Sequence, residues 1–118
     1  MVSLLILTLL WQSTDKMRRR VKVSKTAEKK LSQLLEFLEE KWSAKVKLDF
    51  IKKLGRCIEL IRTDPHIFPE SNKKGGLHKC TISKQTSLYY RFTADTIFII
   101  TIFDNRQNPS KLNKEIKG

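Results

Sequence analysis

The sequence is poor in residues that bind metals or build disulfide frameworks. It contains two cysteines and two histidines in 118 residues, and neither pair shows the spacing of a metal-binding motif. Cys57 and Cys80 lie in separate apolar segments, with no Cys-x-x-Cys pair. This pattern is typical of buried, reduced thiols in a cytosolic protein. We therefore expect no metal ion, no cofactor and reduced cysteines.

A hydrophobic run long enough to cross a membrane is also missing. Residues 2–11 are nearly all apolar, but a membrane-spanning helix needs about 20 such residues. The basic residues 18–20 follow this run, whereas a signal peptide carries its basic residues before it, and no small-residue cleavage site is clear. We favour Met17 as the natural start, with residues 1–16 as a non-native or disordered leader. The alternative is a short leader that associates with membranes, although we expect no stable membrane association.

Acidic residues are half as frequent as basic ones. The chain has 24 lysines and arginines against 12 acidic residues, a net charge of +12. Residues 1–16 contain one lysine and one aspartate, so the net charge is the same without them. Such an excess favours a polyanionic or acidic partner, namely nucleic acid, an anionic membrane or an acidic protein. The composition and length are typical of one small globular domain.

The apolar periodicity predicts one strand and then two helices. Residues 19–23 alternate basic and apolar side chains, which indicates a short edge strand. Ser24 and Ser43 are good N-caps for the helices that follow, and Asp64-Pro65 ends the second. The connection is very short, so the helices must form an antiparallel hairpin. The apolar stripes have helical spacing and consist of Ala27, Leu31, Leu34, Leu35, Leu38 and Trp42, then Val46, Phe50, Ile51, Leu54, Cys57, Ile58 and Ile61.

Three strands are expected to follow in an antiparallel meander. Residues 77–84 and 88–93 alternate, and residues 97–103 are apolar on both faces, as expected for a central strand covered by helices on one side. The order strand, helix, helix, strand, strand, strand predicts an α+β fold, with a helical hairpin packed on one face of a small antiparallel sheet. The opposite face is expected to carry Lys79, Tyr89 and Arg91.

Several single residues carry local expectations. Ile67 and Phe68 are expected to anchor the loop at residues 65–76. Gly55, inside the second helix, is expected to permit close packing. His78 is expected on the surface of its strand, and the glycine pair beside Lys73 and Lys74 is interpreted as an ordinary turn, because it lacks the full spacing of a phosphate-binding loop.

The element order, together with several sequence segments, resembles the RelE/ParE family of type II toxin–antitoxin toxins. The matching segments are residues 17–28, the loop at Pro65, residues 76–79, residues 88–92 (LYYRF) and residues 102–109 (IFDNRQNP). The resemblance covers residues 17–112 and leaves residues 113–118 as a basic tail. It implies a cytoplasmic toxin that a cognate antitoxin neutralises. Such antitoxins are acidic, partly disordered chains that fold along the toxin, bury its apolar groove and cover its basic face.

The family divides by target, and the resemblance leaves the target open. RelE-like members are ribosome-dependent mRNA endoribonucleases, whereas ParE-like members inhibit DNA gyrase and have no hydrolytic centre. Arg91 and Arg106 match the two arginines of the nuclease branch, and Lys79 is a loose match to one of its lysines. Thr81 occupies the second lysine's place, and Leu112 stands where a tyrosine would fall. The cations of a nuclease site are therefore present, but its acid–base residues are incomplete.

We therefore slightly favour gyrase inhibition. The first alternative is an mRNA endoribonuclease, an enzyme in which Arg91, Arg106 and Lys79 would be catalytic. The second is a degenerate module that only binds an antitoxin. Structural roles are also open, because Arg91 can pair with a carboxylate across the sheet, Arg106 can brace its turn with Asp104, and Tyr89 can pack in the core. The residues expected to bind the target or the antitoxin are Lys79, Tyr89, Arg91, Arg106 and Asn108.

Overall fold

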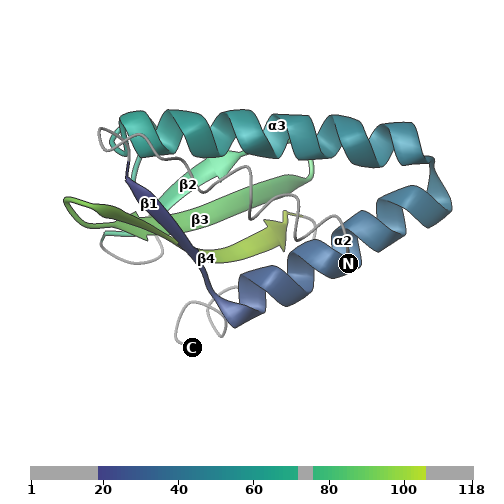
Figure 1. Ribbon diagram of the computed structural model, residues 1–118, viewed down its shortest axis with the longest axis horizontal. Helices are drawn as coiled ribbons and strands as arrows, with labels where there is room; N and C mark the ends of the chain where they lie inside the picture. The colour runs from purple at the N-terminus through teal and green to yellow at the C-terminus, as the bar shows by residue number, and fades with distance from the viewer. Residues whose placement is uncertain (1–18, 72–75, 106–118) are drawn as a thin grey trace.

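A four-stranded sheet carries two helices on one face (Figure 1). The computed structural model describes residues 19–71 and 76–105. The order of elements is the predicted one, so the α+β prediction is confirmed. The elements are β1 (Arg20–Val23), α2 (Lys25–Lys41), α3 (Ala44–Thr63), β2 (His78–Thr81), β3 (Thr86–Phe92) and β4 (Thr96–Asp104).

The sheet is mixed, because its first strand adds in parallel. The strand order is β1-β4-β3-β2, and β2, β3 and β4 form the predicted antiparallel meander. β1 occupies the predicted edge position, but it pairs with β4 in parallel, with Val21 opposite Ile97. A parallel pair requires a long crossover connection. The helical hairpin provides the first part of that crossover.

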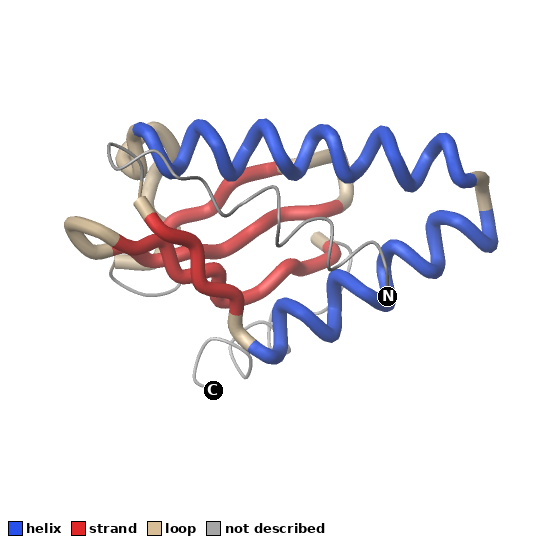
Figure 2. The backbone as a smooth tube through the Cα atoms, viewed as in Figure 1, coloured by secondary structure: helices blue, strands red, loops and turns tan. Residues whose placement is uncertain are grey.

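Both helices begin at the predicted capping serines. The Ser24 hydroxyl oxygen accepts a hydrogen bond from the Ala27 amide at 3.0 Å, and the Ser43 hydroxyl oxygen accepts one from the Val46 amide at 3.1 Å. α3 ends at Asp64, as predicted. Figure 2 shows that the two helices are joined by a short connection and diverge from it, so the hairpin is open rather than tightly paired.

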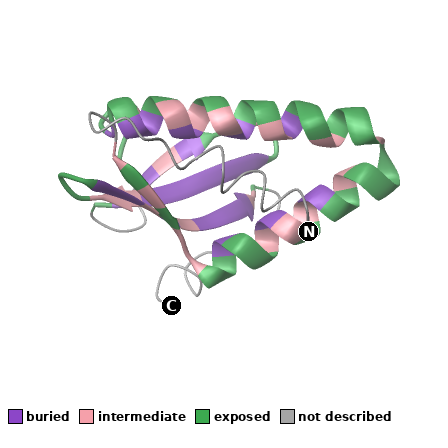
Figure 3. Cartoon of the chain, viewed as in Figure 1, coloured by how far each residue is buried: buried purple, intermediate pink, exposed green. Residues whose placement is uncertain are grey.

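The main core lies between the helices and the sheet. Figure 3 shows the buried residues concentrated on the strands and on the helix sides that face them. A smaller apolar cluster, made of Leu77, Tyr89, Phe103 and Ile100, lies outside this core. The buried members of the main core are Ala27, Leu31, Leu35, Phe50, Leu54, Ile58, Ile61, Cys80, Ile82, Leu88, Tyr90, Ile97, Ile99 and Ile102.

A β-bulge in β4 explains why that strand is apolar on both faces. Tyr89 pairs with Thr101, but Tyr90 pairs with Ile99, so Ile100 is an extra residue on β4. An extra residue reverses the alternation of the strand beyond it. Ile97 and Ile99 before the bulge and Ile102 after it therefore all join the main core. Ser24 stabilises the bulge, because its hydroxyl donates to the Ile100 carbonyl at 2.6 Å.

Arg62 fastens the end of α3 to the start of β1. Its side chain is buried although it carries a charge, and burial of a charge requires hydrogen-bonding partners. Its Nε donates to the Arg19 carbonyl at 2.7 Å, and its Nη1 donates to a Glu59 carboxylate oxygen at 3.1 Å. The apolar stripe predicted for this helix from the sequence did not include Arg62.

Three local predictions are wrong. Trp42 does not continue the stripe of α2; it caps the helix and is 70% exposed. Ile67 is exposed, whereas Phe68 packs on the main core as predicted. Gly55 permits no close contact, because an added Cβ would meet no atom within 4 Å.

Candidate functional site

The predicted basic face lies on β2 and β3. Lys79 on β2 is opposite Tyr89 on β3 in the antiparallel pair. Arg91 also lies on β3, two residues after Tyr89. Alternation along a strand therefore puts all three on one face, which the Tyr89 cluster identifies as the face away from the helices. Lys79 and Arg91 are partly exposed. Arg106 and Asn108 lie outside the described residues, so their predicted roles remain predictions.

Tyr89 packs inside the molecule rather than lying on the surface. It is 4% exposed and belongs to the cluster with Leu77 and Phe103. Burial raises the pKa of its hydroxyl above the ordinary value. Within the described residues, Arg91 has no ion pair with a carboxylate, so the cross-sheet pairing considered for it is not observed. Arg91 and Lys79 are therefore the cations that this part of the sheet presents.

His78 is buried, which contradicts the predicted surface position. It is 7% exposed, and its Nδ1 hydrogen-bonds the Phe68 carbonyl at 2.8 Å. Its ring stacks on Tyr90, with a centroid distance of 5.3 Å, and is tilted against Phe92 at 5.1 Å. The physical reason is the loop after α3, which folds against the β2 edge and forms an isolated bridge from Glu70 to His78. His78 therefore holds this loop and has one ring nitrogen occupied.

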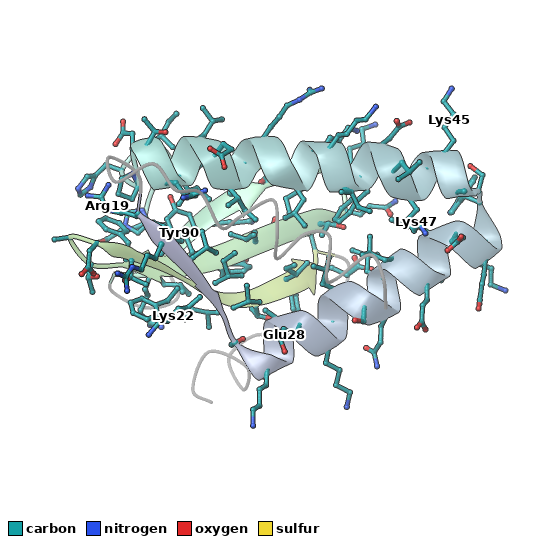
Figure 4. The ribbon with its side chains drawn as sticks, viewed as in Figure 1. Arg19, Lys22, Glu28, Lys45, Lys47 and Tyr90 are labelled. Carbon is teal, nitrogen blue, oxygen red and sulfur yellow. The ribbon has the colours of Figure 1, made fainter. Side chains whose placement is uncertain are left out.

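Tyr90 also binds the loop after α3. Its hydroxyl donates to the Pro65 carbonyl at 2.8 Å, and its ring is fully buried. Burial is the main reason that its pKa is raised above the ordinary range. Figure 4 shows Tyr90 and Arg19 at the same end of the sheet. The tyrosines and the histidine near Lys79 and Arg91 thus all have packing roles. The sequence analysis had allowed a packing role for Tyr89 but had placed His78 on the surface.

An apolar groove lies between α2, the turn from β2 to β3, and the end of β4. It encloses about 390 Å³. Phe37 and Trp42 line it and are 47% and 70% exposed. The Lys30 ammonium on its border lies 5.0 Å from the centre of the Phe103 ring. The other lining residues are Gln33, Leu34, Leu38, Phe50, Ser83, Gln85, Thr86, Ile102 and Asp104.

The groove was expected from the resemblance, but its place was not predicted. Its lining comes from four segments of the chain, namely α2, α3, the turn from β2 to β3 and the end of β4, so no local pattern could reveal it. The one sequence signal was Trp42, an apolar residue at the end of a stripe. An exposed aromatic cluster on a small protein commonly marks a protein-binding surface.

Among residues 19–71 and 76–105, no group of His, Cys, Asp and Glu side chains has the arrangement of a metal site. In the same part of the chain, neither helix is both long and apolar enough to cross a membrane.

The fold and these surfaces define a small basic α+β domain with an open apolar groove. The family model for the ParE toxin of the type II toxin–antitoxin system parDE matches residues 21–109. The chain therefore belongs to the ParE toxin family, which confirms the RelE/ParE resemblance and favours its ParE branch over the RelE alternative.

One solved structure supports the fold. A chain described as a chromosomal ParDE toxin–antitoxin system from P. aeruginosa matches with a TM-score of 0.62. The two sequences are 12% identical, and the match covers 75% of this chain and 97% of that one. No curated protein matches the sequence.

Proposed function

We propose that this toxin-family protein inhibits growth in the cytoplasm by binding DNA gyrase. The observation that carries the proposal is the chemistry around Lys79 and Arg91. Cleavage of RNA through its 2′-hydroxyl needs a general base and a general acid besides cations. The acid–base candidates on β2 and β3 themselves, His78, Tyr89 and Tyr90, are buried, and two of them are hydrogen-bonded to backbone carbonyls. Among the described residues, the two strands that carry Lys79 and Arg91 present no exposed histidine or tyrosine, which suits binding better than hydrolysis.

The two targets can be separated by assaying both activities with one set of variants. Purified protein is added to a gyrase supercoiling reaction, and messages are mapped by primer extension after induction in cells. We expect inhibited supercoiling, an SOS response and intact messages. Arg91→Ala should weaken the inhibition at least about tenfold, the usual effect of losing a charged hydrogen bond. Arg56→Ala is the matched control, because Arg56 is an exposed arginine on α3.

The opposite result would support the alternative target. If messages are cut at fixed codon positions and the cuts disappear with Arg91→Ala, the protein is an endoribonuclease rather than a gyrase inhibitor. The observation that favours this alternative is that Lys79 and Arg91 lie on one face of the sheet. Expression without growth arrest, and without either activity, would leave only an antitoxin-binding role.

Family membership implies a cognate antitoxin, and we propose that an acidic, partly disordered antitoxin segment occupies the apolar groove. Phe37 and Trp42 offer apolar contact area that water now covers. The net charge of +12 favours an acidic partner. An amphipathic helix laid into a hydrophobic groove is a common way to satisfy both features.

Trp42→Ser tests this site. Because Trp42 is exposed, the variant should keep its stability within about 0.5 kcal/mol. Removing a central aromatic from an interface commonly costs about 2 kcal/mol or more, so the affinity should fall roughly 30-fold. Leu48→Ser is the control, because Leu48 is 53% exposed but does not line the groove. Calorimetric titration with the product of the neighbouring reading frame measures both, and equal affinities for the two variants would remove the groove from the interface.

A further inference from the structure

Phe98 is an aromatic residue of the central strand β4 that joins neither apolar cluster. It lies between Ile97 and Ile99, which both belong to the main core, so alternation turns Phe98 to the face away from the helices. It is partly exposed, and it is packed neither on the main core nor on the Tyr89 cluster. Among the described residues, it takes part in no ring–ring or cation–π contact. Core packing in this part of the chain therefore does not explain an aromatic side chain at this position.

Two cations flank Phe98 across the sheet. Lys22 on β1 is its partner in the parallel pair, and Arg91 on β3 is its partner in the antiparallel pair. Directly opposed residues on neighbouring strands point to the same face, and the strands are about 4.8 Å apart. Lys22 and Arg91 are therefore about 10 Å apart, with Phe98 between them. We call these three residues the cation–aromatic row.

The lysines and arginines of the strands all lie on this outer face. Arg20 and Lys22 alternate with valines that pack on the main core, so both point away from the helices, as do Lys79 and Arg91. Figure 4 shows the Lys22 side chain on the side of the sheet away from α3. Arg20 and Lys22 are exposed, and Lys79 and Arg91 are partly exposed. The row therefore lies within a larger positively charged surface.

Acidic side chains of the described residues do not neutralise this surface. The acidic residue of the four strands is Asp104, the last residue of β4, which borders the groove. Asp95, on the turn before β4, accepts hydrogen bonds from the hydroxyls of Thr93 and Thr96 at 3.0 Å each. Among the described residues, Lys22 and Arg91 have no ion pair with a carboxylate. The charges beside Phe98 are therefore available to an anionic ligand.

We propose that the cation–aromatic row binds a single strand of nucleic acid, with a base stacked on Phe98 and phosphates paired with Lys22 and Arg91. An unpaired base has a free face that stacks on an aromatic side chain, and its neighbouring phosphates pair with cations on either side. The bases of a duplex are already stacked on each other, and an acidic peptide or an anionic lipid surface needs the cations but not the ring. A single strand is the polyanion that uses all three side chains.

This binding goes beyond gyrase inhibition and does not rest on it. Lys22 and Phe98 are not among the residues that the resemblance to the nuclease branch identifies, and the row lies apart from the groove, whose lining includes none of its members. Binding to an oligonucleotide is measured without gyrase or antitoxin, so failure of this proposal and failure of the proposed function are separate results.

The test uses the full chain and a labelled oligodeoxythymidine of about 12 nucleotides, which is within the site sizes of single-strand-binding domains. Fluorescence anisotropy gives the affinity at several salt concentrations. We expect the single strand to bind more tightly than a duplex of equal length, although the duplex has the higher charge density, because only unpaired bases can stack on Phe98. Oligouridine in the same assay distinguishes RNA from DNA as the source of the strand.

Two variants of Phe98 separate stacking from charge. Phe98→Leu keeps an apolar side chain but removes the aromatic face, so the affinity should fall at least about fivefold. The slope of log affinity against log salt should not change, because no charge is lost. Phe98→Trp keeps an aromatic face and should bind at least as tightly as the parent chain. Both substitutions retain a large apolar residue, and circular dichroism melts check that each variant is folded.

Lys22→Gln tests the contact with phosphate. Each phosphate contact on a single strand contributes about 0.7 to the steepness of the salt dependence, so the slope should become shallower by about that amount. Lys45→Gln is the matched control, because it removes the same charge from an exposed lysine on α3, far from Lys22 in Figure 4. Its slope should equal that of the parent chain.

Several results would overturn the proposal. Equal slopes for Lys22→Gln and Lys45→Gln, or parental affinity for Phe98→Leu, would show that diffuse charge alone holds the strand. Equal or tighter binding of the duplex, of polyglutamate or of phosphatidylserine vesicles would identify a different class of partner. Binding of oligodeoxythymidine or of oligouridine with the expected variant effects supports the row as the site, and binding of neither strand refutes it.

Discussion

Ser24 is predicted to contribute about twice as much stability as the other capping serine. Its hydroxyl oxygen accepts from the Ala27 amide at 3.0 Å and its hydroxyl hydrogen is donated to the Ile100 carbonyl at 2.6 Å. Loss of an N-cap costs about 1 kcal/mol, and loss of a hydrogen bond to a bulge carbonyl costs about 1 kcal/mol more. Ser24→Ala should therefore lower the free energy of unfolding by about 2 kcal/mol.

Ser43→Ala is the matched control. Ser43 caps α3 through one hydrogen bond, from the Val46 amide at 3.1 Å, so its loss should cost about 1 kcal/mol. For a domain of this size we expect the melting temperature to fall by about 10 °C for Ser24→Ala and about 5 °C for Ser43→Ala. Circular dichroism melts and urea titrations measure both values. Ser24→Thr retains acceptor and donor and should restore most of the loss. Equal losses for the two alanine variants would refute a role for the bond to the bulge.

Three further changes have defined expected results. Leu54→Ala removes a fully buried side chain and should lower the free energy of unfolding by about 2–5 kcal/mol; a loss under 1 kcal/mol in urea titration would contradict the assigned core. Gly55→Ala, one residue on, should raise it by about 0.5–1 kcal/mol, because the added methyl meets no atom and alanine favours the helix. Tyr90 has a raised pKa in the folded protein, so its unfolded form ionises first and stability should fall above about pH 10, by up to about 1.4 kcal/mol per pH unit. Tyr90→Phe should make this decline shallower in titrations between pH 9 and pH 11, and an unchanged slope would show that Tyr90 is not its source.

The regular elements of the fold follow from local patterns. Ser24, Ser43 and Asp64 bound the two helices where the sequence predicted, because capping and the effect of proline on the preceding residue act within a few positions. The predicted strands are the observed ones for the same reason, since alternation is a property of neighbouring residues. These elements, together with the segments around Arg91, were enough to identify the family.

The candidate sites depend more on packing than on pattern. Lys79 and Arg91 were placed on one face from alternation alone, and the register agrees. The burial of His78 and the exposure of Trp42 could not be predicted, because each depends on other segments of the chain. His78 is covered by the loop after α3. Trp42 lines an open groove together with the turn from β2 to β3 and the end of β4.

The sequence by itself determined where the helices and strands lie, the positive charge, and which branch of chemistry the residues near Arg91 favour. Only the tertiary structure decided that β1 joins β4 in parallel, that a bulge at Ile100 turns three isoleucines toward the helices, and that the loop after α3 buries His78. The physical reason is how far apart in the chain the interacting residues lie. Caps, stripes and alternation are set by residues a few positions apart, whereas strand register, grooves and the burial of loop contacts arise when the helical hairpin closes over the sheet.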